Sequence, residues 1–202
     1  MSGLSARERR DRAMWYDANN DSEMLTERLE ARELAYEFNH TRPADEGRQR
    51  EILERLLGHV GERVTVLAPF FVDCGYLVSI GDDSFVNYGA YFMDGASIAI
   101  GRHVFIGPNC GLYTARHPLV PAERNLGLER ALPIVIEDDC WLGGDVKVLA
   151  GVTIGRGSTI GAGSVVTRDV PPGVVAAGNP CRVLRAVSEA DSVMRKAAIG
   201  EP

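Results

Sequence analysis

Residues 136–167 read IEDDCWLGGDVKVLAGVTIGRGSTIGAGSVVT, and a bulky apolar residue returns at every sixth position of this stretch. These residues are Ile136, Leu142, Val148, Ile154, Ile160 and Val166. The same spacing occurs upstream, with one slip of two residues, at Ile80, Val86, Phe92, Ile100, Ile106 and Leu112. Glycine often follows the apolar residue, and a small or modest residue such as Cys140 occupies the fifth position.

A six-residue period fits a unit of one strand and one corner. In an α-helix this spacing would scatter the apolar residues around the whole circumference, and each recurrent glycine would cost about 1 kcal/mol. In a strand, the first and fifth positions face the same side, and we expect the glycine at the second position to let the chain turn. With three units to a coil, Ile136 lies over Ile154 in a continuous core, which defines a parallel β-solenoid.

Composition narrows the class of protein. The 202-residue chain is 45% hydrophobic and 25% charged, as expected for a globular protein with one core and a small appendage. Its formal net charge of −6, with no basic run, argues against a general affinity for nucleic acid or anionic membrane. No apolar run could span a bilayer, and the first residues lack the apolar stretch of an export signal, so we expect a cytoplasmic protein. The 4 cysteines form no CxxC pair, which indicates neither a zinc site nor a disulfide framework.

The limits of the repeat divide the chain into three parts. Residues 1–59 lack the repeat and form an expected helical cap, which would cover one open end of the solenoid. Residues 60–186 form the β-solenoid, from which a loop over about 113–133 projects before the repeat resumes. We expect a short helix or tail over 187–202.

Two helices are expected in the cap. Apolar residues at helical spacing predict a helix over 22–38, with residues 20–22 as candidates for its N-cap. A second helix is expected over 43–57, with Pro43 in its first turn and Gly58 at its end.

The projecting loop carries the strongest candidate for chemistry. Long loops on rigid repeats are typical places for function. His117 lies near the start of this loop, beside Pro118, which restricts its backbone. A near-neutral imidazole is suited to take the proton from an alcohol that attacks a carbonyl. We therefore expect His117 to act as a general base.

Several motifs outside and inside the repeat resemble those of a known family. They are YEFNH (36–40), TARHP (114–118), CWLGG (140–144), GVTIG (151–155), IGAGSVVT (160–167) and AGNPCR (177–182). Together they resemble the maltose and galactoside O-acetyltransferases among the hexapeptide-repeat acyltransferases, with the nodulation-factor acetyltransferases as close relatives. The resemblance implies a left-handed β-helix, an exception to the usual right-handed crossover. It also implies acetyl-CoA as co-substrate, a sugar hydroxyl as acceptor, no metal, and homotrimers with sites between subunits.

The resemblance further implies roles for particular residues. His117 would be the general base, and Asn87 would lie beside the reacting centre. The residues that match acceptor contacts are Asp17, Arg28, Asp73, Phe85, Asn87 and Asp94. The residues that match the lining of the CoA groove are Trp141, Gly143, Gly144, Ala162, Thr167, Arg168, Arg182 and Arg185.

The residue types at the donor groove suit this ligand. Arg168, Arg182 and Arg185 form a local basic cluster that fits the phosphorylated adenosine end of CoA. A small residue such as Gly144 lets the thin pantetheine arm lie close to the backbone. Trp141 stands at the sixth position of the repeat and should point outward, where a tryptophan indicates a ligand or a partner subunit.

The sequence leaves alternatives open for the acceptor and for the class of activity. Asp73 stands where the galactoside branch has serine, which favours a maltose or glucoside acceptor, while Gly95 replaces an acidic residue of that branch. A galactoside, an oligosaccharide or serine are the other acceptors. A zinc enzyme of the solenoid carbonic anhydrase type needs three converging histidines, and the repeat region has only His103 and His117. A non-catalytic trimeric scaffold is the remaining alternative.

Overall fold

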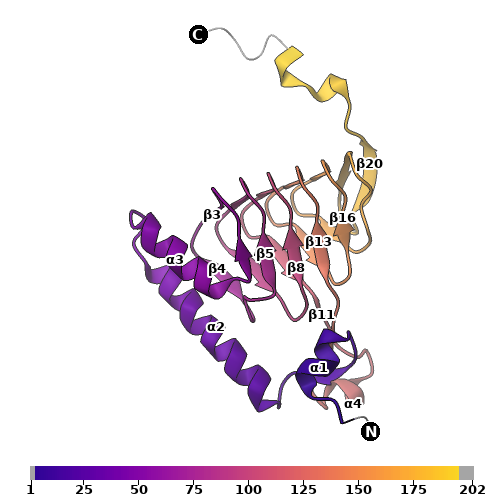
Figure 1. The fold of residues 1–202 in the computed structure, drawn as a ribbon. Coiled ribbons are helices and arrows are strands. Elements are labelled where there is room, and N and C mark those ends of the chain that lie inside the picture. Colours follow the sequence, from indigo (N-terminus) through magenta and orange to yellow (C-terminus); the bar gives the residue numbers. More distant parts are fainter. Residues whose placement is uncertain (1–2, 196–202) are drawn as a thin grey trace.

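The computed structural model describes residues 3–195 and forms a three-faced prism of parallel strands (Figure 1). Face 1 contains β2 (His59–Val60), β5 (Val78–Ile80), β8 (Ile98–Ile100), β13 (Ile134–Ile136) and β16 (Thr153–Ile154). Face 2 contains β3 (Thr65–Val66), β6 (Phe85–Val86), β9 (Phe105–Ile106), β14 (Trp141–Leu142), β17 (Thr159–Ile160) and β19 (Val174–Ala177), with β20 (Arg182–Ala186) at its edge. Face 3 contains β4 (Phe70–Val72), β7 (Ala90–Met93), β10 (Gly111–Tyr113), β15 (Lys147–Leu149) and β18 (Val165–Val166).

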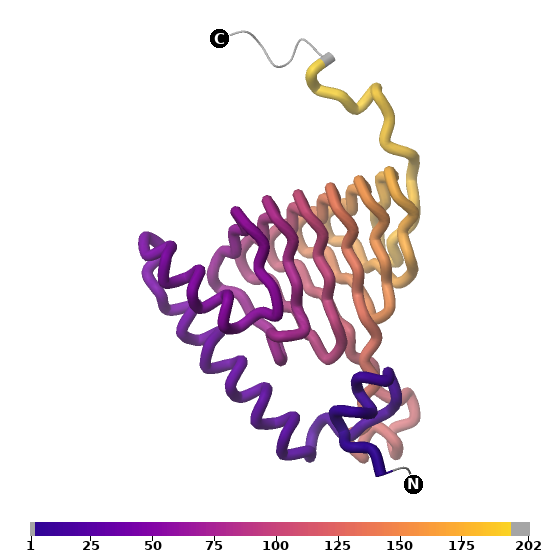
Figure 2. The backbone as a smooth tube through the Cα atoms, in the orientation of Figure 1, coloured from indigo at the N-terminus to yellow at the C-terminus, as the bar shows by residue number. Residues whose placement is uncertain are grey.

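The stacking expected from the repeat is confirmed. Ile136 pairs with Ile154 on face 1, and Leu142 pairs with Ile160 on face 2. The apolar residues at the first position of the repeat are buried from Ile80 onward. Successive coils therefore share one continuous core, and Figure 2 follows them as turns of similar shape along the prism.

The expected role of the recurrent glycines was wrong. Left-handed backbone occurs at many corners, at the fourth position of the repeat, as at Asn109 (φ 57°) and Asp145 (φ 60°). The glycines at the second position allow neighbouring coils to approach each other. A Cβ on Gly107 would lie 2.6 Å from the backbone nitrogen of Gly144 in the next coil, closer than real Cβ contacts.

The cap consists of α2 (Ser22–His40) and α3 (Glu46–Leu56). The first expected helix is confirmed and runs two residues further, whereas the second begins three residues later and ends one residue earlier than expected. Asp45 is the N-cap of α3, because its carboxylate accepts the backbone N–H of Arg48 at 3.2 Å, so Pro43 lies outside the helix. Gly58 already belongs to the first coil, since its N–H donates to the carbonyl oxygen of Val78 at 3.0 Å.

The cap covers the end of the prism, as expected (Figure 1). Phe38 of α2 and Ile52 of α3 are fully buried in the same core cluster as Phe70 of the first coil. The side-chain amide of Asn39 completes the junction: it donates to the carbonyl oxygen of Phe70 at 2.9 Å and accepts the N–H of the same residue at 2.8 Å.

The projecting loop is a β-hairpin, where the sequence had predicted an irregular loop. It contains β11 (Ala115–Arg116), α4 (Pro121–Arg124) and β12 (Leu128–Ala131). The N-terminal α1 (Ala6–Asp11) precedes β1 (Tyr16–Asp17), which adds to the hairpin in the order β1-β12-β11. We call α1, β1, β11, α4 and β12 the side assembly; in Figure 1 its helices α1 and α4 lie beside each other, away from the C-terminal end.

The chain reverses at the far end of the prism. β20 pairs antiparallel with β19, and two short 3-10 turns follow at Glu189–Asp191 and Val193–Arg195. The expected C-terminal helix is thus represented by these two turns, and residues 196–202 lie outside the described part. Within residues 3–195, no helix has the length and apolar character needed to cross a membrane.

Candidate active site

His117 follows β11 at the root of the side assembly. Its Nδ1 lies 3.0 Å from the backbone carbonyl oxygen of Leu128 on β12. Because a carbonyl oxygen only accepts hydrogen bonds, Nδ1 carries the ring proton, and Nε2 keeps the free lone pair. The imidazole lines a cavity of about 880 Å³ together with Trp15, Arg116, Pro118, Leu119, Glu123 and Leu128. The ring is thus held by one nitrogen while the other can serve as a base.

Two side chains beside this imidazole were missed by sequence reasoning. A carboxylate oxygen of Glu129, Oε2, lies 3.9 Å from Nε2 of His117. The Tyr16 hydroxyl donates a hydrogen bond to Oε1 of the same carboxylate. Tyr16 and Glu129 are 113 positions apart, and no local pattern in the sequence could have paired them.

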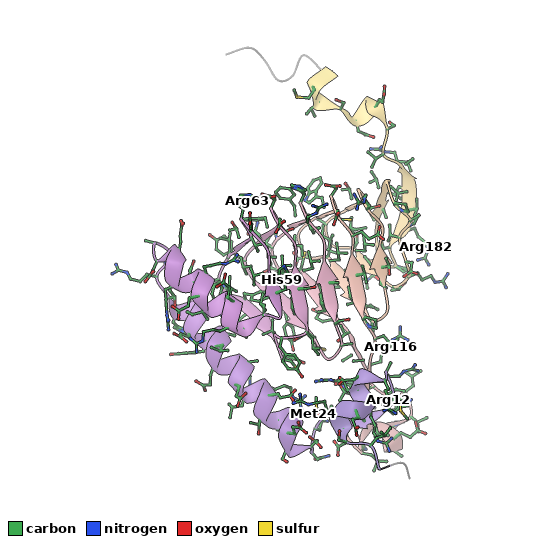
Figure 3. All side chains as sticks on the ribbon, viewed as in Figure 1. Arg12, Met24, His59, Arg63, Arg116 and Arg182 are labelled. Atoms are coloured by element: carbon green, nitrogen blue, oxygen red, sulfur yellow. The ribbon has the colours of Figure 1, made fainter. Side chains whose placement is uncertain are left out.

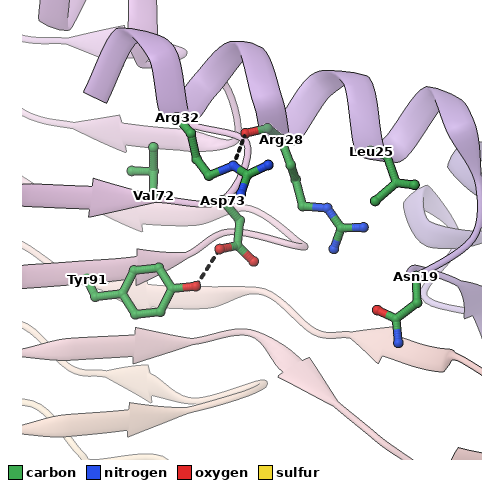
Figure 4. A pocket seen from close by; sticks show the side chains of 7 residues that line it. All are labelled: Asn19, Leu25, Arg28, Arg32, Val72, Asp73 and Tyr91. Carbon is green, nitrogen blue, oxygen red and sulfur yellow. Dashed lines mark hydrogen bonds between the residues drawn. The ribbon is translucent and has the colours of Figure 1, made fainter. Parts of the chain in front are cut away.

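A second pocket, of about 390 Å³, opens between α2 and face 3 (Figure 4). Its lining brings together two predicted acceptor contacts, Arg28 and Asp73. The Asp73 carboxylate accepts a hydrogen bond from the Tyr91 hydroxyl. Arg32 also faces this pocket and was missed, although its position one helical turn after Arg28 is a signal that could have found it. The other lining residues are Asn19, Leu25 and Val72.

Two other predicted acceptor contacts are engaged in local structure. Asp17 Oδ1 accepts the backbone N–H of Asn20 at 2.9 Å, which holds the turn after β1. Asp94 directly follows β7 in the sequence and is fully buried. Its Oδ1 accepts hydrogen bonds from the backbone N–H groups of Asp73 and Cys74 at 3.0 and 2.8 Å. Burial raises the pKa of Asp94 to about 7. Its Oδ2 has no hydrogen-bond partner within the described residues. The roles of both residues toward an acceptor stay predictions.

Donor-side residues gather along a different edge of the prism. The registers of face 2 stack Val86, Ile106, Leu142 and Ile160. The residues that follow them, which include Asn87, Gly143, Gly144 and Ala162, therefore line the corner between faces 2 and 3. His117 lies beyond face 3, at the corner that leads to face 1. A single chain consequently does not bring His117 and Asn87 together.

Two hydrogen-bond donors at the corner between faces 2 and 3 are free to meet a ligand. The Oδ1 of Asn87 accepts the N–H of Tyr88 at 2.8 Å, which fixes the amide and leaves its NH₂ group as a donor. The N–H of Gly143 already donates to the carbonyl oxygen of Ile160 at 2.8 Å. The N–H of Gly144 donates to no group in the part of the chain that the structure describes.

An aromatic row crosses the outside of face 2. Phe85 pairs with Phe105, and Phe105 pairs with Trp141 on successive strands. Phe105 and Trp141 are 53% and 55% exposed, so the expected outward position of Trp141 is confirmed. Phe85, a predicted acceptor contact, lies in this row and does not line the pocket of Arg28 and Asp73.

The predicted basic cluster is only partly assembled. Arg168 and Arg182 line a small pocket of about 140 Å³ near the C-terminal end of the prism. Thr167 lies exposed beside Arg168. Arg185 instead forms a bidentate ion pair with Asp191, at 2.7 and 2.8 Å. Figure 3 shows Arg182 on β20, well away from the side assembly.

Known proteins match both parts of this architecture. Residues 12–61 match the maltose acetyltransferase hexapeptide capping motif, and residues 133–168 match the bacterial transferase hexapeptide with six repeats. SH0499 of Staphylococcus haemolyticus, assigned as an acetyltransferase, is 51% identical over 178 residues, which cover 88% of this chain and 93% of its own.

Solved structures extend the comparison to nearly the whole chain. A maltose O-acetyltransferase of Clostridium difficile 630 superposes with a TM-score of 0.90 at 39% identity, covering 92% of this chain and 99% of that one. The hexapeptide-repeat acetyltransferase VCA0836 of Vibrio cholerae, solved with acetyl coenzyme A, superposes with a TM-score of 0.84 at 38% identity, covering 92% and 100%.

Capped prism and sequence matches together define a hexapeptide-repeat acetyltransferase, with a left-handed parallel β-helix of about six turns. Within that class, the chain belongs to the maltose and galactoside O-acetyltransferase family. The resemblance expected from the motifs is thereby confirmed at the level of fold and acetyl transfer.

Proposed function

We propose that this protein transfers acetyl from acetyl-CoA directly to a sugar hydroxyl, with maltose or a glucoside as the favoured acceptor. The observation that carries this proposal is the orientation of His117. Its Nδ1 is held by Leu128 O at 3.0 Å, and Nε2 is left free on the wall of a large cavity. This is the state that a general base needs before it meets an alcohol.

In the proposed reaction, Nε2 of His117 takes the proton of the acceptor hydroxyl as its oxygen attacks the thioester carbonyl. The tetrahedral intermediate collapses, the C–S bond breaks, and the imidazolium returns the proton to the CoA thiolate. Direct transfer needs no metal, because a thioester is already an activated acyl donor. We assign the stabilisation of the oxyanion to the NH₂ group of Asn87 and the N–H of Gly144, since these donors have no competing partner among residues 3–195.

We further propose that the working enzyme is a homotrimer with its sites between subunits. His117 and the acceptor pocket lie around one corner of the prism, whereas Asn87 and Gly144 lie along another. A complete site then requires the first corner of one subunit to meet the second corner of its neighbour. The exposed aromatic row of Phe105 and Trp141 supports face 2 as part of that contact.

The donor would lie along the corner of Gly144 and Ala162, with its phosphorylated end toward Arg168 and Arg182. Arg185 would have to exchange its ion pair with Asp191 to join them. Acetyl-CoA is a cytoplasmic metabolite, and we place the reaction in that compartment.

An acceptor panel tests the proposal. The protein is incubated with acetyl-CoA and with maltose, glucose, a galactoside, a chitin oligomer or serine, and the release of free thiol is followed. We expect thiol only with an acceptor present, the highest rates with maltose or glucose, and none with serine. Light scattering on the same sample should give about three times the 21.9 kDa mass of the chain.

Each other outcome selects an alternative. Preference for the galactoside or the chitin oligomer would overturn the inference drawn from Asp73, and strong acetylation of serine would remove the sugar assignment. Binding of acetyl-CoA without transfer to any member of the panel would leave only the acyltransferase class. A trimer that does not bind CoA would support the non-catalytic scaffold.

A further inference from the structure

The strand β1 brings a buried tyrosine against the hairpin that carries His117. β1 and β12 pair antiparallel, with Tyr16 directly opposite Glu129 and Asp17 opposite Leu128. Directly opposed side chains of such a pair lie on the same face of the sheet. The Tyr16 side chain is only 2% exposed, and its hydroxyl donates to Oε1 of Glu129. One carboxylate oxygen is thus held by a residue from the far N-terminal part of the chain.

The direction of this hydrogen bond is fixed. Burial, and then the neighbouring charge of Glu129, raise the pKa of the Tyr16 hydroxyl far above its usual range. Tyr16 therefore stays protonated and acts as the donor, while Glu129 accepts. With Oε1 engaged in this way, the second oxygen, Oε2, is left to face His117.

The two nitrogens of His117 then meet different partners. Nδ1 donates to the carbonyl oxygen of Leu128 at 3.0 Å. Nε2 lies 3.9 Å from Oε2 of Glu129, which is too long for a hydrogen bond, so the carboxylate does not occupy the lone pair. When Nε2 gains a proton, however, the new positive charge lies beside a carboxylate that is largely screened from water.

We propose that Tyr16 and Glu129 are positioning residues for the base: Tyr16 holds the Glu129 carboxylate beside Nε2, and that carboxylate stabilises the imidazolium as it forms. This inference rests on the proposed function, in which His117 takes the proton of the acceptor. Neither residue needs to touch the substrate. Their contribution is specific to the step in which His117 becomes charged, because the neutral ring gains nothing from a nearby carboxylate.

The arginines around His117 are engaged elsewhere. The guanidinium of Arg116 donates to the carbonyl oxygen of Ala150, and that of Arg130 on β12 donates to the carbonyl oxygen of Ala13. On α4, Arg124 donates to the carbonyl oxygen of Pro118, while Glu123 lines the cavity of His117. Within the described residues, Glu129 is the acidic side chain that comes within 4 Å of the ring.

The test uses substitutions that keep shape and remove one function. Glu129→Gln removes the charge, and Tyr16→Phe removes the hydroxyl that holds it. Tyr76→Phe is the matched control, because the Tyr76 hydroxyl also donates to a glutamate, Glu27, at 2.8 Å, and Tyr76 does not line the cavity of His117. His117→Ala serves as the reference. For each variant, acetyl transfer to the best acceptor of the panel is measured as kcat and kcat/KM from about pH 5 to 9.

We expect the acidic limb of kcat/KM to move to lower pH in Glu129→Gln, because the protonated ring loses its counter-charge. The plateau of kcat should fall about tenfold, and the KM for acetyl-CoA should stay unchanged. Tyr16→Phe should move the limb in the same direction and lower kcat about threefold. Tyr76→Phe should leave the acidic limb in place and kcat within about twofold of that of the unchanged protein.

A double substitution separates a shared action from two independent ones. If Tyr16 acts through Glu129, adding Tyr16→Phe to Glu129→Gln lowers kcat no further, within about twofold. Two results would refute the positioning role, provided that His117→Ala is inactive. One is a double variant whose loss of kcat equals the product of the two single losses, and the other is an acidic limb of kcat/KM that does not move in Glu129→Gln. If His117→Ala keeps its activity, the proposed base itself fails, and this result is distinct from failure of the positioning role.

Nitrogen-15 NMR of the imidazole rings provides a readout that does not depend on turnover. The chain has 4 histidines, so His117→Ala identifies the resonance of interest. The spectrum should report a ring with the proton on Nδ1, and its titration midpoint should move to lower pH in both Glu129→Gln and Tyr16→Phe. A midpoint that stays in place in folded Glu129→Gln protein would overturn the inference.

Discussion

The prism and the side assembly are held together in opposite ways. In the prism each interior residue has an equivalent above and below it, as Phe92 has Val72 and Leu112 in register. A small apolar cluster of Tyr16, Ala18 and Met24 joins the side assembly to α2 of the cap. The two-residue strands β1 and β11 of the side assembly each pair with β12 over two residues, and the hydrogen bond from Tyr16 to Glu129 adds one side-chain contact between β1 and β12.

This difference separates stability from chemistry. The repeated coils provide many similar contacts for folding, so the loss of one lowers stability and leaves the arrangement of the others intact. The side assembly contributes little apolar burial but holds the imidazole proposed as the base. Substitutions in the two regions should therefore act on different measurements.

The largest effect is expected from Phe92→Ala in the prism. Phe92 is fully buried and meets Phe70 edge to face, with ring centroids 5.1 Å apart. Its truncation should lower the free energy of unfolding by about 3–5 kcal/mol, because it leaves a cavity between coils. Urea unfolding measures this loss. At urea concentrations below the unfolding transition, kcat should stay within about twofold of that of the unchanged protein. A large fall in kcat of the folded variant would contradict the assignment of stability to the prism and of activity to the side assembly.

His117→Ala should have the reverse profile. We expect kcat to fall at least about a hundredfold, equivalent to about 2.7 kcal/mol, while urea unfolding and CoA affinity stay unchanged. The rate of thiol release and the affinity for CoA, measured on one preparation, check this expectation.

Mixed trimers sharpen the same test. His117→Ala chains and Asn87→Ala chains, each inactive alone, should regain part of the activity when unfolded and refolded together, because some contacts then pair an intact His117 with an intact Asn87. No recovery in mixtures that form trimers would remove the site between subunits.

A smaller effect is expected from Asp94→Asn, at the junction between the two regions. Burial raises the pKa of this carboxyl from 3.8 to about 7, so the folded protein holds a proton that the unfolded chain releases. Stability should therefore fall as the pH rises from about 4 to 7. Asparagine removes this cost, and the variant should gain on the order of 2 kcal/mol over the parent above pH 7 and little near pH 4. Urea unfolding at both pH values measures the difference, and a pH-independent gap would contradict it.

Sequence periodicity predicted the prism because every coil repeats the same chemistry. Ile136 over Ile154 follows from spacing alone, and α2 follows from its apolar stripe. The second helix was placed too early because proline is common in a first turn, whereas the Asp45 carboxylate binds the free N–H of Arg48 and decides the start.

The site was less predictable for a physical reason. His117 stands beside a proline at the start of a loop, and both features can be read locally. Glu129 and Tyr16 reach it through strands of two to four residues, which are too short to produce an alternating pattern. His117 and Asn87 lie at different corners of the prism, and this separation can be seen only from the strand registers of the folded protein.

The separation of 113 positions between Tyr16 and Glu129 sets an order of events during synthesis. Neighbouring coils join residues about twenty positions apart, as Arg63 and Asp83 do, and the cap packs on the coil that directly follows it. The cap and the early coils can therefore assemble while the chain is still being made. β1 has to wait for β12 to emerge from the ribosome. A product truncated ahead of Glu129 keeps the cap and its first coils but lacks β12 and every coil that follows it, so the surroundings of His117 are completed only after the cap and the early coils have been made.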